Sequence, residues 1–337
     1  MFGTGSTHSM LDEICIKRRA GRKFDPGSVL AGRWTIVSSL SHQGGDISDG
    51  CFNRGIKLVT DARDQRSYVL KMLTPDICLP GHAARELRIL QHLTRCAGED
   101  PTNLVRLYAM EDGARHPHDI PWIMTEHCDA GTLAHMMTMC EDEQVNFPEP
   151  FLWHVFQSLA QAARFCHSNG VVHRDITLTN VFVQNAQAND IYPSIKLADF
   201  GCAVTRDDLE TLSIGELFPG NPRYMPPEGC EANPSCDIYQ LGLVMLCMFM
   251  REAEPTEALA DFYSNQGCQT YSPELRNLIH WCLSKNAKDR PSADVLVRKI
   301  EESRSQMAQY KGQMSFEDLL KRERKGSLDS VASDVTD

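Results

Sequence analysis

Two short segments carry side chains whose types and spacing could do chemistry. The segment Val172–Asn180 places a carboxylate at Asp175 and a carboxamide at Asn180, after a short apolar run. The segment Ile195–Gly201 ends in Asp199-Phe200-Gly201. Carboxylate and amide oxygens are the ligands that Mg²⁺ prefers, and a carboxylate can orient a hydroxyl group and accept its proton. One Asp-Phe-Gly alone is an ordinary turn, but the two segments in this order predict a metal-assisted site.

This ordered pair resembles the catalytic loop and the metal-binding loop of eukaryotic protein kinases, and the resemblance covers roughly Trp34–Ile300. Phosphoryl transfer needs alignment and charge neutralisation rather than covalent help from the protein. The resemblance implies that Asp175 orients the attacking hydroxyl, and that Asn180 and Asp199 hold Mg²⁺. The catalytic residues that it implies are Asp175, Lys71, Glu86 and Asn180.

Lys71 lies in the apolar, strand-like run Tyr68–Leu73. An ammonium group without an anionic partner would be costly there, and Glu86, on the helical pattern that follows, is the best partner by position. The resemblance implies that Lys71 binds the α- and β-phosphates of ATP and that Glu86 pairs with it. A solvated lysine at a sheet edge is the alternative interpretation of Lys71 taken alone.

The same resemblance implies a binding site for ATP, with Mg²⁺ as the second cofactor. The run Ile123–Cys128 looks like the strand and hinge whose backbone, from Glu126 to Cys128, binds adenine, with Thr125 as the small residue beside it. A plain buried strand end is a compatible alternative for this run. The ATP-contacting residues that the resemblance implies are Gly50, Phe52, Val69, Lys71, Thr125, Glu126, Cys128, Phe182 and Asp199.

Four features depart from the family pattern. The phosphate-binding loop has an early glycine pair, Gly44-Gly45, and an insertion before Gly50, while Val69 stands where the family has alanine. Thr177 stands where serine/threonine kinases carry a lysine. Asn221 stands where those kinases carry a threonine that contacts this lysine and the catalytic aspartate. Because the last two positions meet in the family, their departures concern the choice of substrate.

The resulting prediction is a protein kinase that transfers the γ-phosphate of ATP to a protein hydroxyl, with serine and threonine favoured by family frequency. The alternative is a pseudokinase, a nucleotide-binding or scaffold module without turnover. The irregular phosphate-binding loop and the departures at Val69, Thr177 and Asn221 motivate it. A kinase that acts on a small molecule is a third class. The complete segment from Asp199 to Glu228 argues against that class.

The segment 219–228 resembles the end of an activation segment. A buried carboxylate and a guanidinium need each other, and the resemblance pairs Glu228 with the distant Arg290. It also implies that Asp237 anchors the catalytic loop, although a simple helix cap is the alternative. Arg174 is implied to bind a phosphate on this segment. One of three hydroxyls is predicted to be phosphorylated, with ordinary loop hydroxyls as the alternative: Thr205, Thr211 and Ser213.

These residues need two kinds of scaffold. The first part of the chain is strand-rich with a helical pattern at His82–Leu93, and helical patterns dominate from Pro150 onward. By resemblance, this change predicts an α+β protein with the bilobal protein kinase fold, a small β-rich N-lobe with one key helix and a larger, mostly helical C-lobe. The predicted divisions are an N-terminal extension at 1–33, the N-lobe at 34–126, the C-lobe at 127–306 and a disordered C-terminal tail at 307–337.

Composition limits the location and the partners. The 337 residues are 42% hydrophobic and 23% charged, which is typical of a globular protein, and their net charge is −11. An acidic chain is a poor candidate for binding nucleic acid or an anionic membrane, and the longest apolar run, Leu241–Met250, is too short to span a bilayer. The thirteen cysteines form no CxxC pair and the N-terminus shows no secretory signal. We therefore expect a cytoplasmic or nuclear protein. The partners that the resemblance implies are ATP and a protein substrate.

Overall fold

The structure is a computed structural model that describes residues 24–40, 53–73, 81–98, 102–113, 120–143, 146–186, 192–211, 220–229, 233–264 and 271–305. Several predicted features lie outside the described residues, namely Gly44-Gly45, Gly50, Phe52, Ser213, residues 1–23 of the N-terminal extension and the tail from residue 307. The chain divides into two compact units. The first comprises the chain up to Thr94 with Arg106–His127, and the second comprises Arg95–Val105 and the chain from Cys128 onward.

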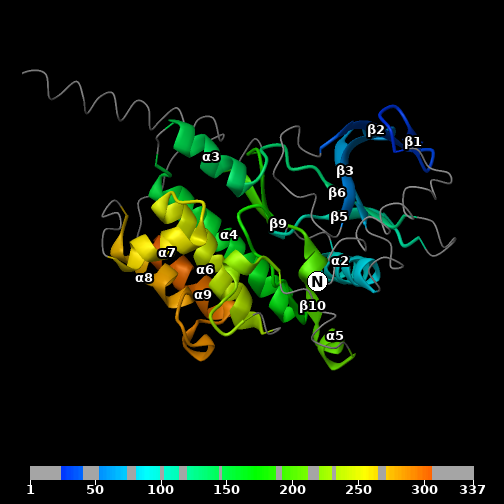
Figure 1. Cartoon of the computed structure of the whole chain (residues 1–337). Coiled ribbons are helices and arrows are strands. Elements are labelled where there is room, and N and C mark those ends of the chain that lie inside the picture. The colour runs from blue at the N-terminus through cyan, green and yellow to red at the C-terminus, as the bar shows by residue number, and fades with distance from the viewer. Residues whose placement is uncertain are drawn as a thin grey trace, which may run out of the picture. The chain divides into compact units, whose positions relative to one another are not determined.

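The first unit is built on a six-stranded antiparallel sheet with the strand order β1-β2-β3-β4-β6-β5 (Figure 1). Side chains alternate between the two faces of each strand, and Tyr68 and Leu70 of β4 lie on the buried face with Leu30, Ile36, Val59, Trp122 and Met124. The strands are β1 (Val29–Leu30), β2 (Trp34–Ser39), β3 (Asn53–Asp61), β4 (Ser67–Leu73), β5 (Leu107–Glu111) and β6 (Trp122–Glu126).

Helix α2 (His82–Ala97) provides the one helix predicted for the N-lobe. Its residues Ala83, Leu87, Leu90 and Leu93 recur at helical spacing and are buried, as an amphipathic helix requires. The sheet of this unit begins at β1, before residue 34, where the predicted N-lobe starts.

The second unit is mostly helical. Helix α6 packs against α4, α7 and α8, and α4 packs against α9 (Figure 1). Apolar residues lie on all sides of α6, which is typical of a buried helix, and the side chain of Asn233 caps its start by accepting from the N–H of Ser235. The helices are α3 (Leu133–Glu143), α4 (Glu149–Ser168), α5 (Arg206–Thr211), α6 (Pro234–Met250), α7 (Pro255–Tyr263), α8 (Pro273–Cys282) and α9 (Ala293–Ser305).

Two small antiparallel strand pairs hold the segments predicted to do chemistry. Strand β7 (Val171–Val172) pairs with β10 (Val204–Thr205), and β8 (Val181–Gln184) pairs with β9 (Ser194–Leu197). The predicted catalytic loop, residues 173–180, therefore joins β7 to β8, and Asp199 follows β9.

Residues Arg95–Val105 belong to the second unit, whereas the predicted division at residue 126 placed them in the N-lobe. The N–H of Val105 donates to the backbone O of Leu197 at 2.9 Å, and Leu104 forms a parallel bridge with Leu197. A sheet-rich first unit and a helical second unit confirm the predicted α+β class. Within the described part of the chain, no helix is long and apolar enough to cross a membrane.

Candidate functional site

In the first unit, Lys71 of β4 meets a carboxylate of α2. Its ammonium Nζ lies 2.8 Å from Oε1 of Glu86. The side chain of Glu86 is fully buried, and that of Lys71 is 11% exposed. A buried carboxylate loses its hydration, so a cation within reach has to compensate. The pair predicted from the sequence is therefore formed, and Lys71 is not a solvated edge lysine.

Val69, Lys71 and Thr125 share one face of the sheet. Val69 pairs directly with Thr125, and Lys71 with Ile123, across β4 and β6. Directly opposed residues project to the same face, and so do residues two apart along one strand. Leu70, between Val69 and Lys71, points to the core on the other face. The sheet thus separates the core from a face that carries three of the residues predicted to contact ATP.

The end of β6 is held by a reciprocal contact between Glu126 and Arg106. The N–H of Glu126 donates to the backbone O of Arg106 at 3.0 Å, and the N–H of Arg106 donates to Oε1 of Glu126 at 2.8 Å. The carboxylate of Glu126 is therefore engaged with backbone of its own unit. In the second unit, Cys128 is buried and Phe182 of β8 is half-buried. The contacts of Glu126, Cys128 and Phe182 with adenine stay a prediction.

Asp175 lies at the centre of a set of polar contacts in the second unit. Its Oδ1 accepts a hydrogen bond from the backbone N–H of Asn221 at 2.8 Å, and its Oδ2 accepts one from Nδ2 of Asn180 at 2.9 Å. Burial raises the pKa of Asp175 above its ordinary value, the Asn221 bond acts to lower it, and the charge of Asp199 acts to raise it. The carboxylate therefore has a fixed orientation and an increased affinity for a proton.

Asn180 and Asp199 lie at the same end of the β8–β9 pair. Strand β8 begins directly after Asn180, β9 ends directly before Ala198, and the N–H of Ala198 donates to the backbone O of Asn180 at 2.9 Å. Asp199 has a φ of 61°, in the left-handed region, and its Oδ1 accepts from the N–H of Gly201 at 3.2 Å. This local turn stabilises a backbone conformation that is uncommon for residues other than glycine.

The donor atoms of Asn180 and Asp199 fit a hard divalent cation. Asn180 directs its Nδ2 to Asp175, and no hydrogen bond within the described residues engages its Oδ1, so this oxygen is available as a ligand. The charge of Asp199 raises the pKa of Asp175, and a cation here would offset that repulsion. The described residues hold no group of three or more His, Cys, Asp or Glu suited to a metal. An amide and one carboxylate leave positions for phosphate oxygens and water, as Mg²⁺ prefers.

Thr177 and Asn221 use their polar side chains locally. Oγ1 of Thr177 lies 2.9 Å from Oγ1 of Thr179, and Thr177 is 2% exposed. Oδ1 of Asn221 accepts from the N–H of Arg223 at 3.0 Å and caps the 3₁₀ turn Pro222–Tyr224. Among the hydrogen bonds of the described residues, none joins these two side chains. The contact that the family places here is replaced by the backbone N–H of Asn221, which reaches Asp175 directly.

Gly220 permits this close approach of the chain to Asp175. Its φ is 80°, and a Cβ at this position would collide with the backbone O of Arg174. A residue with a side chain would therefore be strained in conformation and would push residues 220–221 away from the loop.

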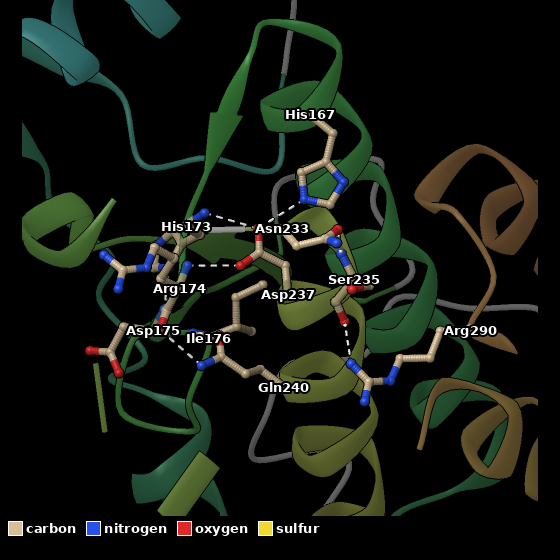
Figure 2. A network of polar contacts seen from close by, with 10 residues as sticks. All are labelled: His167, His173, Arg174, Asp175, Ile176, Asn233, Ser235, Asp237, Gln240 and Arg290. Atoms are coloured by element: carbon tan, nitrogen blue, oxygen red, sulfur yellow. Dashed lines mark hydrogen bonds and ion pairs between the residues drawn. The ribbon is translucent and has the colours of Figure 1, made fainter. Parts of the chain in front are cut away.

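Helix α6 holds the backbone of the catalytic loop through Asp237 (Figure 2). The carboxylate accepts from the N–H of His173 at 2.9 Å and from that of Arg174 at 2.8 Å, and it lies 2.8 Å from Nε2 of His167. Burial acts to raise the pKa of Asp237, but the contacts with His167 and His173 outweigh it, so the pKa lies below its ordinary value. Asp237 is thus the loop anchor that the resemblance implied, and it is more than a helix cap.

Gln240 is a second contact between α6 and the loop, and sequence reasoning gave it no role. Its Nε2 donates to the backbone O of Arg174 at 2.8 Å, and its Oε1 accepts from the N–H of Ile176 at 2.9 Å. The signal that could have found it is a polar side chain in an apolar helix, three residues after Asp237 and therefore on the same helical face.

Glu228 and Arg290 form the distant ion pair that was predicted. Nη1 and Nη2 of Arg290 lie 2.6 and 2.7 Å from the two carboxylate oxygens of Glu228. Arg290 also donates to the backbone O of Ser235 at 3.1 Å and stacks on the ring of Tyr239. Burial acts to raise the pKa of Glu228, but the hydrogen bonds and charge of Arg290 help to hold it below its ordinary value. This bidentate pair ties the segment after Gly220 to the helical unit.

Two of the three predicted phosphorylation sites are described, and both bond within the start of the activation segment. Oγ1 of Thr205 donates to Oδ2 of Asp208 at 2.7 Å, and Oγ1 of Thr211 donates to the backbone O of Asp207 at 2.8 Å. A phosphate on Thr205 would face the Asp208 carboxylate and be repelled. Thr211 is exposed, so it is the better placed of the two, and its phosphorylation stays a prediction.

Comparisons with known proteins agree on one family. A family model described as the protein kinase domain matches residues 43–300. The mouse serine/threonine-protein kinase Nek9 is 31% identical over 192 residues, which are 52% of this chain and 18% of that protein. The mouse interferon-induced, double-stranded RNA-activated protein kinase is 23% identical over 310 residues, which are 86% of this chain and 56% of that protein. The matched regions thus span 18% to 56% of the length of these relatives.

Proposed function

Because the chain belongs to the protein kinase family, we propose that it is an active kinase that transfers the γ-phosphate of ATP to serine or threonine hydroxyls of a protein. The observation that carries this proposal is the geometry of Asp175, whose two carboxylate oxygens are held by Asn221 and Asn180. Burial in addition raises its pKa. A general base works best when its proton affinity approaches the working pH. Asp175 would orient the substrate hydroxyl and accept its proton as the oxygen attacks phosphorus.

The remaining site residues would bind the nucleotide. When bound, Mg²⁺ and ATP supply the phosphoryl group and neutralise the charge on its oxygens. Asn180 and Asp199 offer oxygen ligands for the metal, and Lys71, oriented by Glu86, offers a cation for the phosphates. Val69, Thr125, Glu126, Cys128 and Phe182 would surround the adenine, and Gly50 and Phe52 would cover the phosphates.

The preference for serine and threonine rests on the relatives. Nek9 and PLK2 are both named as serine/threonine-protein kinases, and mouse PLK2 is 29% identical to this chain over 191 residues, 52% of the chain and 26% of that protein. The protein substrate itself would be recognised by surfaces that these partial matches do not identify.

A pseudokinase is the second candidate, and a specific observation favours it. Thr177 is neutral and its hydroxyl bonds to that of Thr179, and the Asn221 side chain caps a turn, so neither side chain provides a cation next to Asp175. A module of this kind would bind nucleotide, or serve as a scaffold, without turnover.

We further propose a cytoplasmic location, with the nucleus as the alternative. All eight cysteines of the described residues are free thiols, and seven of them are buried. Free thiols are typical of reducing compartments. Imaging of the tagged full chain would test this, and an extracellular or luminal location would contradict it.

Labelled phosphate transfer tests the proposed activity. We would incubate the full chain with Mg²⁺, γ-labelled ATP and a generic protein substrate, alongside Asp175→Asn and Lys71→Met. Asp261→Asn serves as the control because this carboxylate is exposed on α7. The wild type and the control should label substrate, and both site variants should be slower by about a hundredfold or more. An Asp175→Asn variant that labels as well as the wild type would refute the role of Asp175. A wild type that transfers nothing, yet is stabilised by about 2.7 kcal/mol at one hundred times its Kd for Mg²⁺–ATP, would establish the pseudokinase.

A further inference from the structure

Gln240 and Asp237 form hydrogen bonds to neighbouring parts of the catalytic-loop backbone (Figure 2). Asp237 accepts from the N–H groups of His173 and Arg174. These belong to the peptide units before Arg174. Gln240 contacts the C=O of Arg174 and the N–H of Ile176. These belong to the two peptide units that flank Asp175. Two side chains one helical turn apart thus hold four consecutive peptide units.

Each peptide unit beside Asp175 is held at both of its ends. In the unit before it, Nε2 of Gln240 binds the C=O of Arg174, and the N–H of Asp175 donates to Nδ1 of His173 at 3.3 Å. In the unit after it, Nδ2 of Asn180 binds the C=O of Asp175 at 2.9 Å, and Oε1 of Gln240 accepts from the N–H of Ile176 at 2.9 Å. Because a peptide unit is planar, fixing both units fixes the φ and ψ angles of Asp175.

We propose that Gln240 is a positioning residue of the phosphoryl-transfer site, whose carboxamide sets the backbone of Asp175 and thereby the direction of its carboxylate. The inference rests on the proposed kinase function. Gln240 acts through Asp175 and touches neither nucleotide nor substrate. It extends the role that the family resemblance assigns to Asp237 alone.

The chemistry of the carboxamide suits this task. One planar group offers a donor and an acceptor at once, whereas a carboxylate offers only acceptors and a thioether is at best a weak acceptor. Both Asp237 and Gln240 are fully buried, so water cannot replace a lost partner. Gln240 therefore fills a position in which most side chains of similar size would leave Arg174 O or Ile176 N–H without a hydrogen bond.

The conformation of Arg174 adds a reason for the hydrogen bonds that Asp237 and Gln240 form to the loop. Its φ is 68°, in the left-handed region that residues with a Cβ rarely adopt. Such strained residues persist only where the surrounding structure holds them. Asp237 binds the N–H of Arg174, and Gln240 binds its C=O. The strained residue directly before Asp175 is therefore held by hydrogen bonds at both of its backbone groups.

Two substitutions separate positioning from mere stability. Gln240→Met keeps the volume and removes both hydrogen bonds. Gln240→Glu keeps the shape, and burial favours the protonated form of the introduced carboxyl, which again has one donor and one acceptor. Met248→Ala is the matched control, because Met248 is buried on α6 about two helical turns further along. Turnover is measured in the full chain, per folded molecule, with Tm recorded for each variant.

We expect Gln240→Met to lower kcat by about ten- to a hundredfold while the KM for ATP changes by less than about twofold, as for a small misplacement of a reacting group. Gln240→Glu should approach the wild-type kcat at low pH and fall behind it as the pH rises and the introduced carboxyl ionises. Met248→Ala should lower Tm without changing kcat. The inference is overturned if Gln240→Met keeps the wild-type kcat, or if Met248→Ala loses kcat equally.

Amide hydrogen exchange separates this inference from the proposed function. If the wild type transfers no phosphate, the kinase proposal fails. The contact between Gln240 and the loop can still be tested by the exchange rate of the Ile176 N–H. Its exchange should accelerate by about tenfold or more in Gln240→Met through local opening. The N–H of His173, held by Asp237, should keep its rate. An unchanged exchange rate at Ile176 would show that Gln240 does not hold the loop.

Discussion

Two groups of residues flank Asp175, and they differ in what they offer to other molecules. The metal side, Asn180 and Asp199, presents oxygen atoms at the end of the β8–β9 pair. The substrate side, Thr177 and Asn221, uses its polar side chains internally, in a contact with Thr179 and in the cap of a 3₁₀ turn. The oxygen ligands that the proposed reaction would need are therefore present, whereas the cation that the family places near the substrate is replaced by neutral groups.

This difference bears on rate more than on whether the reaction occurs. A preorganised donor or cation aimed at developing charge contributes about a hundred- to a thousandfold to the rate. Without a lysine at position 177, stabilisation of the negative charge that develops during transfer would depend on Lys71 and the metal ligands. We therefore expect a slow enzyme. Substitutions on the substrate side can raise its rate of phosphate transfer, whereas substitutions on the metal side lower this rate.

The largest effect should follow from a change on the metal side. Asp199→Asn removes the carboxylate ligand of a hard cation, and we expect phosphate transfer to fall by about a hundred- to a thousandfold at saturating ATP. Initial rates over a range of Mg²⁺ concentrations would show whether excess metal restores part of the loss. Asp207→Asn, an exposed carboxylate on α5, is the control and should keep the wild-type rate. A fully active Asp199→Asn variant would break the comparison, because the metal side would then not be required.

A smaller gain is expected on the substrate side. Thr177→Lys together with Asn221→Thr would restore a cation and a hydroxyl where the family has them, and we expect kcat to rise by roughly two- to tenfold. The effect should exceed the product of the single changes, because residues that contact each other are coupled in a double-mutant cycle. Independent effects of the two substitutions would show that the two positions are not coupled. A double variant slower than both single variants would show that these positions do not limit turnover.

The smallest effect should be a shift in the pH profile. The N–H of Asn221 acts to lower the pKa of Asp175, and the proposed role of Asp175 as a base requires its ionised carboxylate. Asn221→Pro removes this donor at a φ of −72°, which proline accepts, so the pKa of Asp175 should rise further and the acidic limb of kcat should move to higher pH. Asn221→Ala removes the turn cap but keeps the N–H, so its limb should stay in place. Equal shifts in both variants would assign the effect to the cap.

The parts of the site that the sequence predicted correctly are charged pairs. Lys71 lies in an apolar strand, and Glu228 and Arg290 are far apart in the sequence. Both predicted ion pairs nevertheless form, because a buried charged group needs a partner of opposite charge. The strand-rich first part and the helical patterns after it also predicted the sheet of the first unit and the helical second unit in outline.

The parts that were not predicted depend on backbone groups and on local conformation. Every residue except proline has an N–H, so nothing in the sequence distinguished the one at Asn221 that reaches Asp175. The role of Gln240 could not be predicted because it depends on the path of the loop backbone next to α6. The assignment of Arg95–Val105 to the second unit likewise rests on backbone bonds to β9.

One paired measurement tests the central claim most directly. The Kd for Mg²⁺–ATP and the rate of labelled phosphate transfer would be determined on the same preparations of the wild type and of Asp175→Asn. We predict that both proteins bind Mg²⁺–ATP with a similar Kd, and that only the wild type transfers phosphate at a measurable rate. A wild type that binds nucleotide and transfers no more phosphate than Asp175→Asn would contradict the account.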